Sequence, residues 1–301
     1  MAETVVAEPG STGSATPLRA LAERHGLRVA GARPSLPAYL RRIWRYRHFI
    51  TYYANAKLVV AFSTARLGQL WQLLTPIINA AVYYLIFGVI LDTKGGVTNF
   101  IAYLCCGLFV FNFTTAVVQQ STASIAGNLG LIRALHFPRA ALPIAVMLTQ
   151  FQTLLMSVIV LIGIVLITGE PITLDWLLLP PALLLQAIFN VGLAFVMARL
   201  GATLTDLKQV IPFVMRTWMY ASGVLYSVEN FERHLPPWAA TIVEANPLLI
   251  YIELARHALM ESAPLSSSVP MLWAMAVAWA VLFGIGGFVY FWRGEQEYGR
   301  G

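Results

Sequence analysis

The side chains best placed for chemistry form a basic run near the start of the chain. Six lysines and arginines, and no acid, lie between residues 39 and 66. Apolar and aromatic residues recur among them at roughly helical spacing: Leu40, Ile43, Trp44, Ile50 and Tyr53. A basic, aromatic helix of this kind lies in the headgroup layer of a membrane with its cations near phosphate, although a solvated helix packed on a soluble partner is the alternative. The candidate phosphate contacts are Arg41, Arg42, Arg45, Arg47 and Arg66, with Arg216 as an isolated arginine that contacts either cargo or structural hydrogen-bond partners.

Aromatic side chains in the apolar stretches could contact sugar rings. A ring face stacks on a sugar, and a lining of rings with few charges would let a neutral glycan slide without being held. Each ring taken alone is more simply explained by packing or by lipid contact, because tryptophan and tyrosine are ordinary at membrane interfaces. The candidate channel residues are Tyr83, Tyr84, Phe87, Phe109, Phe113, Trp218, Tyr220 and Tyr226.

The sequence contains no constellation for catalysis, for metal binding or for binding of ATP. The five histidines lie in unrelated segments without ligand spacing, so no metal site is expected. None of the three lysines follows a Gly-x-x-x-x-Gly run, so ATP and its magnesium ion are expected on a partner chain, with no cofactor in this one. The expected spans hold no carboxylate pair for a proton or sodium relay. The adjacent Cys105 and Cys106 point in different directions on a helix, which favours packing.

Six apolar stretches must position these residues, and they predict an all-α integral membrane protein with six transmembrane helices. Five stretches carry no charge and reach the roughly 20 residues that a span needs: 67–91, 95–132, 140–169, 176–198 and 262–292. The sixth, about 207–228, is interrupted by Pro212 and Arg216. Runs of this length without alternation exclude a barrel. The mean hydropathy of +0.69 agrees, and the pI near 9.5 reflects basic residues beside membrane segments rather than nucleic-acid binding.

The charge distribution predicts the domain organisation and the topology. Residues 1–34 are expected to be a disordered cytoplasmic tail, 35–66 an amphipathic interfacial helix, 67–293 the six-helix membrane domain and 294–301 the cytoplasmic C-terminus. Loops on one side of the membrane hold twelve basic residues, against three on the other. The positive-inside rule therefore predicts a multi-pass protein of the cytoplasmic membrane with both termini in the cytoplasm.

Two connections between spans carry more than a simple loop. In residues 127–139, glycines and Pro138 bracket about two basic-edged helical turns, which have the size to fill a groove on a soluble subunit. Between the fifth and sixth spans, about 45 outward-facing residues are not simply polar, and Pro236, Pro237 and Pro247 break them into short helical pieces. The resulting pieces are too short to span, which predicts external re-entrant helices.

The order of these features resembles the membrane permease subunit of ABC type-2 exporters, and in particular of those that export O-antigen, teichoic acid or cell-wall galactan. The resemblance covers about residues 37–293 and is carried by short motifs in the expected order. These are LGQLWQLLTP over 67–76, Leu131-Ile132-Arg133 with Phe137-Pro138-Arg139 and Leu142-Pro143, Asp206-Leu207, SGVLYS over 222–227, and Asn246-Pro247-Leu248.

The resemblance implies a transporter subunit rather than an enzyme. Two copies would form a channel between them, two nucleotide-binding ATPase subunits would dock below, and a polyprenyl-pyrophosphate-linked glycan would enter near residues 37–65 among the membrane lipids. A cell-wall galactan is the leading cargo, given the arginine-rich composition. The implied coupling residues are Leu131, Ile132, Arg133, Leu135 and Phe137, and the implied external gate residues are Phe231, Trp238, Asn246 and Pro247.

Two other functions stay open on the sequence. A type-2 exporter of a drug or small lipid would have the same fold without an aromatic lining. A membrane-embedded glycosyl- or acyltransferase acting on lipid carriers would need an acid or a histidine at a membrane face. Asp206 is the candidate for that role, although a carboxylate beside Lys208 is more often a helix-end charge.

Overall fold

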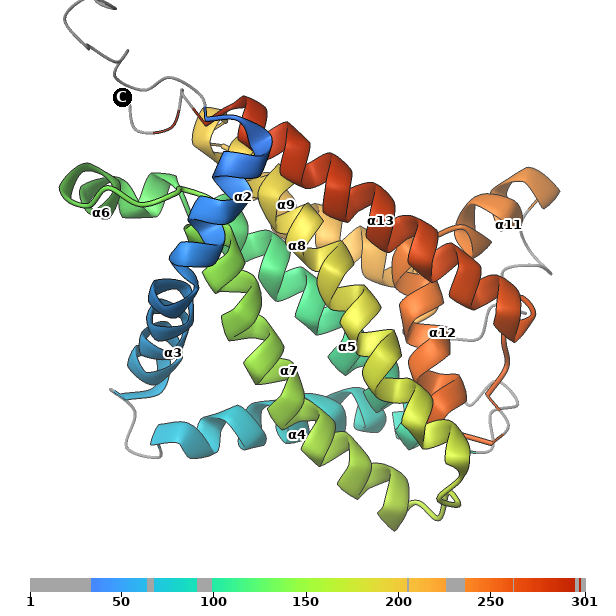
Figure 1. The fold of residues 1–301 in the computed structure, drawn as a ribbon. Helices are drawn as coiled ribbons and strands as arrows, with labels where there is room; N and C mark the ends of the chain where they lie inside the picture. The colour runs from blue at the N-terminus through green and yellow to red at the C-terminus, as the bar shows by residue number, and fades with distance from the viewer. Residues whose placement is uncertain are drawn as a thin grey trace, which may run out of the picture. The chain divides into compact units, whose positions relative to one another are not determined.

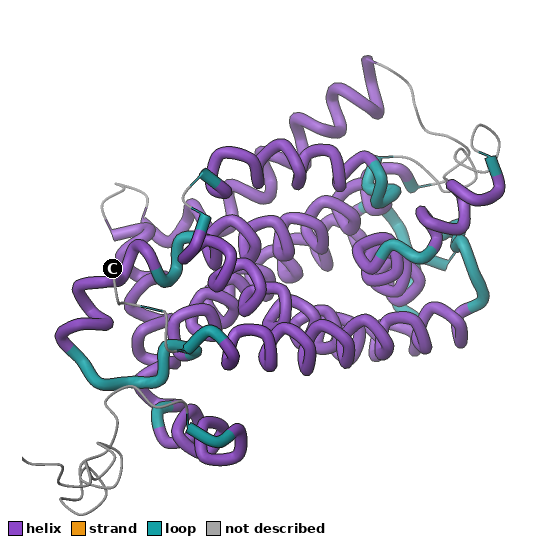
Figure 2. Tube along the Cα trace, turned by 90° about the horizontal axis from the view of Figure 1, so that it is seen from above, coloured by secondary structure: helices purple, strands orange, loops and turns teal. Residues whose placement is uncertain are grey.

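The computed structural model describes residues 34–63, 68–90, 99–204, 206–225, 236–261, 263–295 and 298. The chain divides into Met1–Pro34 and Ser35–Gly301, and the described helices all belong to the second unit. Within the described ranges every regular element is a helix, as Figure 1 and Figure 2 show. The all-helical class is therefore confirmed, whereas the expected tail lies almost wholly outside the described residues.

Among the described residues, four helices are long and apolar enough to cross a membrane. They are α5 (Phe100–Thr122), α7 (Ala141–Ile167), α8 (Leu179–Thr203, preceded by η4, Leu174–Leu178) and α13 (Val269–Arg293). They correspond to the expected second, third, fourth and sixth spans. Helices α8 and α13 run side by side (Figure 1), and their backbones meet at Gly192 and Gly287, where an added Cβ would collide with the facing helix.

The expected first span is helical from Gly68 to Ile90 but changes helix type along its length, whereas the expected fifth span is shorter in the structure. Helix α4 (Trp71–Tyr83) follows a short turn, η1 (Gly68–Leu70), and continues as the π-helical segment η2 (Tyr84–Ile90). Helix α9 (Leu207–Tyr220) has 14 residues, so it extends about 21 Å against the roughly 30 Å of a hydrocarbon core. Both helices contain an internal proline, which removes one backbone hydrogen bond. The count of six spans stays a prediction.

The expected interfacial segment forms two helices that join at Tyr46. The first, α2 (Leu36–Arg45), is amphipathic, because Tyr39 is fully buried while its arginines are exposed. The second, α3 (Arg47–Ser63), packs on α7, where the hydroxyl of Thr149 donates to the carbonyl oxygen of Ala54 over 3.2 Å. On α3, too, Ile50 and Ala54 are buried while Thr51 and Asn55 are exposed, and the position of both helices at a membrane interface stays a prediction.

Between α9 and α13, the described part of the chain contains two further helices. They are α11 (Pro237–Glu244) and α12 (Pro247–Leu259), and each begins with a proline, which suits the first position of a helix. Helix α12 is buried almost all round and contacts α5, α8, α13 and η4. A helix buried on all sides belongs to a protein interior, so α12 is part of the core of this unit, together with its charged residues Glu253 and Arg256. Its re-entrant position relative to a bilayer stays a prediction.

Candidate functional site

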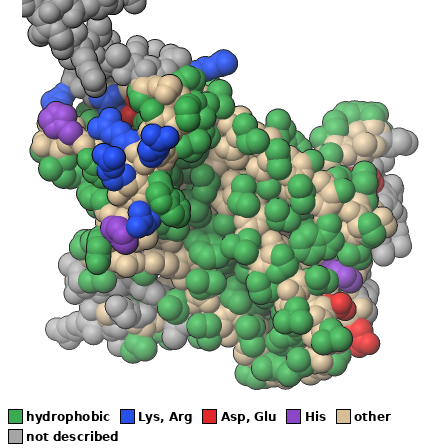
Figure 3. Space-filling model, in the orientation of Figure 1, with side chains coloured by type: hydrophobic (Ala, Val, Ile, Leu, Met, Phe, Trp, Pro, Cys, Tyr) green, Lys and Arg blue, Asp and Glu red, His purple; other side chains and the backbone are tan. Residues whose placement is uncertain are grey.

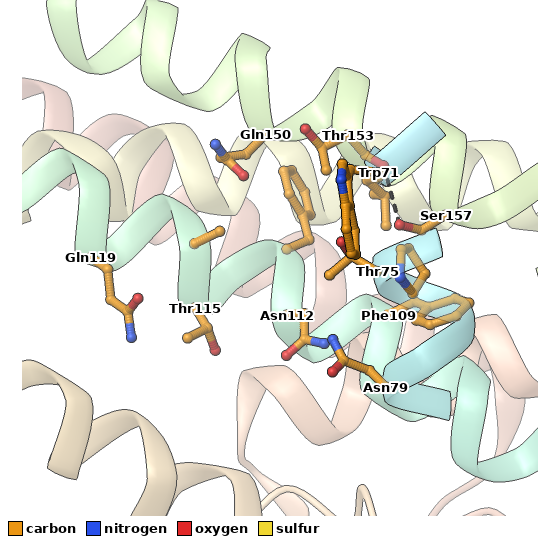
Figure 4. Close-up of a pocket in the computed structure, with 14 residues that line it drawn as sticks. Trp71, Thr75, Asn79, Phe109, Asn112, Thr115, Gln119, Gln150, Thr153 and Ser157 are labelled. Atoms are coloured by element: carbon orange, nitrogen blue, oxygen red, sulfur yellow. Dashed lines mark hydrogen bonds between the residues drawn. The ribbon is translucent and has the colours of Figure 1, made fainter. Parts of the chain in front are cut away.

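A groove of about 460 Å³ lies between α4, α5 and α7 (Figure 4). None of its fourteen lining residues is charged, and eight of them carry an amide or a hydroxyl group. Three rings, of Trp71, Phe109 and Phe113, complete much of the wall. Amides and hydroxyls can exchange hydrogen bonds with sugar hydroxyls, and aromatic faces can stack on sugar rings. The groove therefore has the chemistry to contact an uncharged carbohydrate.

Helical spacing explains how the polar side chains reach the groove. On α5 they are Asn112, Thr115 and Gln119, and on α7 they are Gln150, Thr153 and Ser157. Both sets follow the spacing i, i+3 and i+7, which places each set on one face of its helix. The sequence analysis concentrated on aromatic residues and missed these stripes. They could have been found as polar positions at helical spacing inside two uncharged spans.

The expected channel aromatics divide among several environments. Phe109 and Phe113 line the groove, and their role in a channel stays a prediction. Tyr83 and Phe87 stack on each other with ring centroids 6.2 Å apart, and together with Tyr84 they are partly buried against the core rather than in the groove. The other three are Trp218, which is half-buried, Tyr220, which is exposed, and Tyr226, which lies outside the described residues.

A second cavity, of about 470 Å³, lies beside α2. We call it the arginine pocket, and it is lined by Ala38, Arg41, Arg42, Arg45, Tyr46 and His136. Figure 3 shows Lys and Arg side chains gathered over the region of α2 and α3 on this face. The pocket thus brings together three of the expected phosphate contacts and adds a histidine that lies some 90 residues away in the sequence, and no lining residue is acidic.

Of the other three expected phosphate contacts, Arg47 and Arg216 are described and do not line the arginine pocket. The guanidinium of Arg47 donates to the carbonyl oxygen of Trp44 over 3.2 Å and lies 5.2 Å from the centre of the Trp44 ring. Arg66 lies outside the described residues. Arg216 is exposed on α9, and its role stays a prediction.

The segment with the expected coupling residues projects from the side of the bundle (Figure 1). It contains η3 (Ala126–Asn128) and the short helix α6 (Leu129–Ala134). The hydroxyl of Tyr46 donates to the carbonyl oxygen of His136 over 2.9 Å, and that of Tyr53 donates to Oδ1 of Asn128 over 2.7 Å. The segment is therefore fastened to the α2–α3 region at both of its ends. Of the expected coupling residues, Arg133 and Leu135 are exposed, Leu131 and Ile132 are half-buried, and Phe137 is buried.

Glu295, two residues after the end of α13, contacts the same region. Its carboxylate accepts a hydrogen bond of 2.6 Å from the hydroxyl of Tyr39 and one of 3.3 Å from the backbone N–H of Arg139, whose guanidinium bonds the carbonyl oxygen of Glu295. Burial raises the pKa of Glu295, against the opposing effect of these hydrogen bonds. Burial and the adjacent carboxylate also raise the pKa of Tyr39. This junction, which we call the Glu295 junction, joins α2, the segment after α6 and the end of α13.

The region of the expected external gate is organised around Arg256, which the sequence analysis counted only as a loop charge. Arg256 lies on α12 and is fully buried. Its guanidinium donates to the carbonyl oxygens of Tyr103 (3.2 Å), Gly223 (2.9 Å) and Val224 (3.0 Å) and lies 3.3 Å from the centre of the Tyr103 ring. It therefore ties α12 to α5 and to the turn after α9. The available signal was a single arginine inside an apolar helical stretch.

Asn246 makes a second connection in this region. Its Oδ1 accepts from the backbone N–H of Leu248 (3.1 Å) and from Nε1 of Trp218 (2.9 Å), and its Nδ2 donates to the carbonyl oxygen of Ala221 (2.9 Å). It thus caps α12 and holds the end of α9 beside it. Of the other expected gate residues, Pro247 begins α12, Trp238 is exposed on α11 and Phe231 lies outside the described residues.

Comparison with known proteins gives the family. The model of the ABC-2 type transporter family matches residues 50–260, which include the groove, α6 and α12. The O-antigen export system permease protein RfbA of Myxococcus xanthus is 23% identical over 244 residues, which cover 78% of this chain and 92% of the relative. The polysialic acid transport protein KpsM of Escherichia coli is 25% identical over 202 residues, covering 66% of this chain and 76% of the relative. The resemblance to permease subunits of type-2 polysaccharide exporters, rather than to an enzyme, is thereby confirmed, and the chain belongs to the ABC-2 type transporter family.

Proposed function

We propose that this chain is the membrane subunit of an ATP-driven exporter that moves a polyprenyl-pyrophosphate-linked polysaccharide across the cytoplasmic membrane, with a cell-wall galactan as the leading cargo. The observation that carries the proposal is the uncharged groove lined by amides, hydroxyls and rings. A long neutral polymer must exchange its contacts at every step, and neutral hydrogen bonds and stacking are weak enough to be exchanged. The relatives named for O-antigen export and polysialic acid transport support a polysaccharide cargo.

The groove argues against export of a drug or small lipid. An apolar cargo favours an apolar lining, because buried polar groups that it leaves unpaired are costly. Here eight of the fourteen lining residues carry polar groups, and on α5 and α7 those groups continue for two turns of helix. Such a continuous polar stripe suits a cargo that presents hydroxyl groups along its whole length.

The assembly that goes with this function is a homodimer with two separate ATPase subunits, which hold the ATP and magnesium. The projecting segment with α6 would contact the ATPase, and the arginine pocket would lie at the same cytoplasmic end, where lipid-linked glycan is loaded. Both termini would then be cytoplasmic, in agreement with the positive-inside rule. The region of α11 and α12 would form the external gate.

Depletion of the protein in its host tests the proposal directly. Lipid-linked glycans are then extracted and separated by size. Accumulation of full-length lipid-linked polymer on the cytoplasmic side is the expected result, and it would identify the cargo. Truncated polymer would instead indicate a transferase, and an unchanged glycan profile would indicate small-molecule export.

A pair of matched variants tests the groove. Gln119 lies in the groove on α5, whereas Gln209 is exposed on α9 outside it. Loss of one neutral hydrogen bond, worth about 0.5–1.5 kcal/mol, should slow export roughly two- to tenfold in Gln119→Leu. Gln209→Leu should export at the normal rate. Equal export by both variants at equal membrane abundance would remove the groove from the pathway.

A further inference from the structure

We infer that the arginine pocket binds a phosphate or diphosphate group with at least two negative charges, and that this anion contacts both α2 and the segment that follows α6. The inference rests on the proposed function only for its biological source, since that function supplies a diphosphate at the cytoplasmic end. The pocket itself is argued from its charge, its partners and its position.

The charge of the pocket is not balanced by its own residues. Arg41 and Arg45 lie four residues apart on α2, with Arg42 beside them on the same side of the helix. The structure records no hydrogen bond or ion pair from these three guanidinium groups to another described residue. Like charges at this spacing destabilise a helix, and a bound anion would remove that repulsion. Glu295 does influence Arg42 electrostatically, but its carboxylate oxygens accept hydrogen bonds from Tyr39 and Arg139.

The donors of the pocket match the geometry of a phosphate group. A guanidinium presents paired N–H groups that bind two oxygens of a phosphate at once. Three such groups can neutralise more than one charge, which a diphosphate has and a single carboxylate lacks. The volume of about 470 Å³ accommodates a group of that size with water around it. The observations therefore favour a multiply charged phosphate over a simple carboxylate.

One wall of the pocket belongs to the α6 segment. Tyr46, at the junction of α2 and α3, donates its hydroxyl hydrogen to the carbonyl oxygen of His136 over 2.9 Å. This bond holds His136 against the pocket, only two residues after the end of α6 at Ala134. An anion that binds arginines of α2 and the ring of His136 bridges two elements. Binding of the anion would thus act directly on the segment proposed to contact the ATPase.

Arg47 provides a matched control within the same basic run. Its guanidinium is already engaged with the carbonyl oxygen and the ring of Trp44, and it does not line the pocket. Replacing it removes the same charge from the same region of the chain. If the arginine pocket is a specific site, replacing Arg47 should hardly change anion binding. If the basic residues form only a diffuse charged surface, replacing Arg47 should weaken binding as much as replacing a pocket arginine.

The test is equilibrium binding of inorganic pyrophosphate to the purified full-length chain in phosphatidylcholine nanodiscs, measured by calorimetry. We expect saturable binding by the wild type. Binding should weaken at least tenfold in Arg41→Gln/Arg45→Gln and less than twofold in Arg47→Gln. Absence of saturable binding by the wild type would overturn the inference, and so would equal weakening per charge removed in the Arg47 variant.

The contact with the α6 segment has its own readout. Saturating pyrophosphate should slow hydrogen exchange of the backbone amides between residues 133 and 137 in the wild type. It should not do so in the Arg41→Gln/Arg45→Gln variant, and His136→Gln should reduce the protection. Unchanged exchange in the wild type at saturation would refute the bridge between α2 and this segment.

The source of the phosphate is decided by lipid composition. If nanodiscs with phosphatidylglycerol weaken pyrophosphate binding more than tenfold, the pocket is occupied by a phospholipid headgroup. If they do not, the diphosphate of a glycan carrier is its ligand, and either result supports a phosphate site. Failure of this inference stays distinguishable from failure of the proposed function. A double variant that binds no pyrophosphate but exports normally would separate the pocket from loading, whereas the glycan profile after depletion tests the exporter itself.

Discussion

Replacement of Arg256 by methionine tests the structure of the region between α9 and α13. Methionine has a similar length but no donors, so Arg256→Met leaves the carbonyl oxygens of Tyr103, Gly223 and Val224 without their partner. Each orphaned buried carbonyl costs about 1–3 kcal/mol, and loss of the charge returns several kcal/mol of desolvation, so the expected net destabilisation is about 3 kcal/mol. The stability of Arg256→Lys should lie between those of the wild type and Arg256→Met, because an ammonium group keeps the charge but lacks the planar, forked donors of a guanidinium group.

The measurement is chemical unfolding of the detergent-solubilised protein, followed by tryptophan fluorescence. Arg216→Met is the matched control, since it removes an arginine that is exposed on α9 and should change stability by less than about 0.5 kcal/mol. If Arg256→Met and Arg216→Met unfold at the same denaturant concentration, the argument that Arg256 fastens α12 to its neighbours is refuted.

Three further predictions concern other parts of the fold. Gly192→Ala should destabilise the protein by about 1–3 kcal/mol, because the added methyl group would collide with the backbone of α13. In the control variant Gly163→Ala the methyl group projects into open space, so stability should stay the same or rise slightly. Equal changes in the thermal unfolding temperature of the two variants would contradict this. Leu135→Glu changes a side chain that is 48% exposed, so it should leave insertion intact while uncoupling ATP hydrolysis from export, and retained export would count against a coupling role. Burial raises the pKa of Glu295, so the folded Glu295 junction favours the protonated carboxyl group. The junction should therefore be most stable below pH 4.5, the ordinary pKa of a glutamate, and should lose stability as the pH rises through the raised pKa of Glu295. Exchange protection of the Ala140 amide, corrected for intrinsic rate, should follow this fall in the wild type but not in Glu295→Gln, and protection that rises with pH would contradict it.

The long spans could be predicted because their signal is local. Uncharged runs of sufficient length correspond to α5, α7, α8 and α13 in the structure. The change to a π-helix at Tyr84 and the end of α9 at Tyr220 could not be predicted in the same way, because hydropathy does not register the type of helix or the position of a turn within an apolar stretch. The break at Tyr46 has no apolar or polar signature either, since α2 and α3 follow each other directly.

The functional residues also divide into those with a local signal in the sequence and those without one. The arginines of α2 were found because they are neighbours in the sequence, whereas His136 joins them only through the fold. Arg256 shows most clearly what could not be predicted from the sequence. Its burial depends on a carbonyl oxygen 153 residues away on α5, and nothing in the local pattern of α12 indicates that partner. Charge counting treats such an arginine as a loop residue, while the structure shows it to be a central contact.

The burial of α12 has a consequence for the order in which the chain assembles during synthesis. The helix carries Glu253 and Arg256, both fully buried, and an isolated charged residue at the centre of a membrane helix costs about 2.5–3.5 kcal/mol on the insertion scale. Helix α12 is thus a poor candidate for independent release from the translocation machinery into lipid. The acceptors of Arg256 on α5 and after α9 are made earlier, whereas Ser266, whose backbone N–H and hydroxyl bond the carboxylate of Glu253, is made later. We therefore expect α12 to pack on α5 and on the turn after α9 as it is made, and its burial to be complete only once Ser266 has been synthesised.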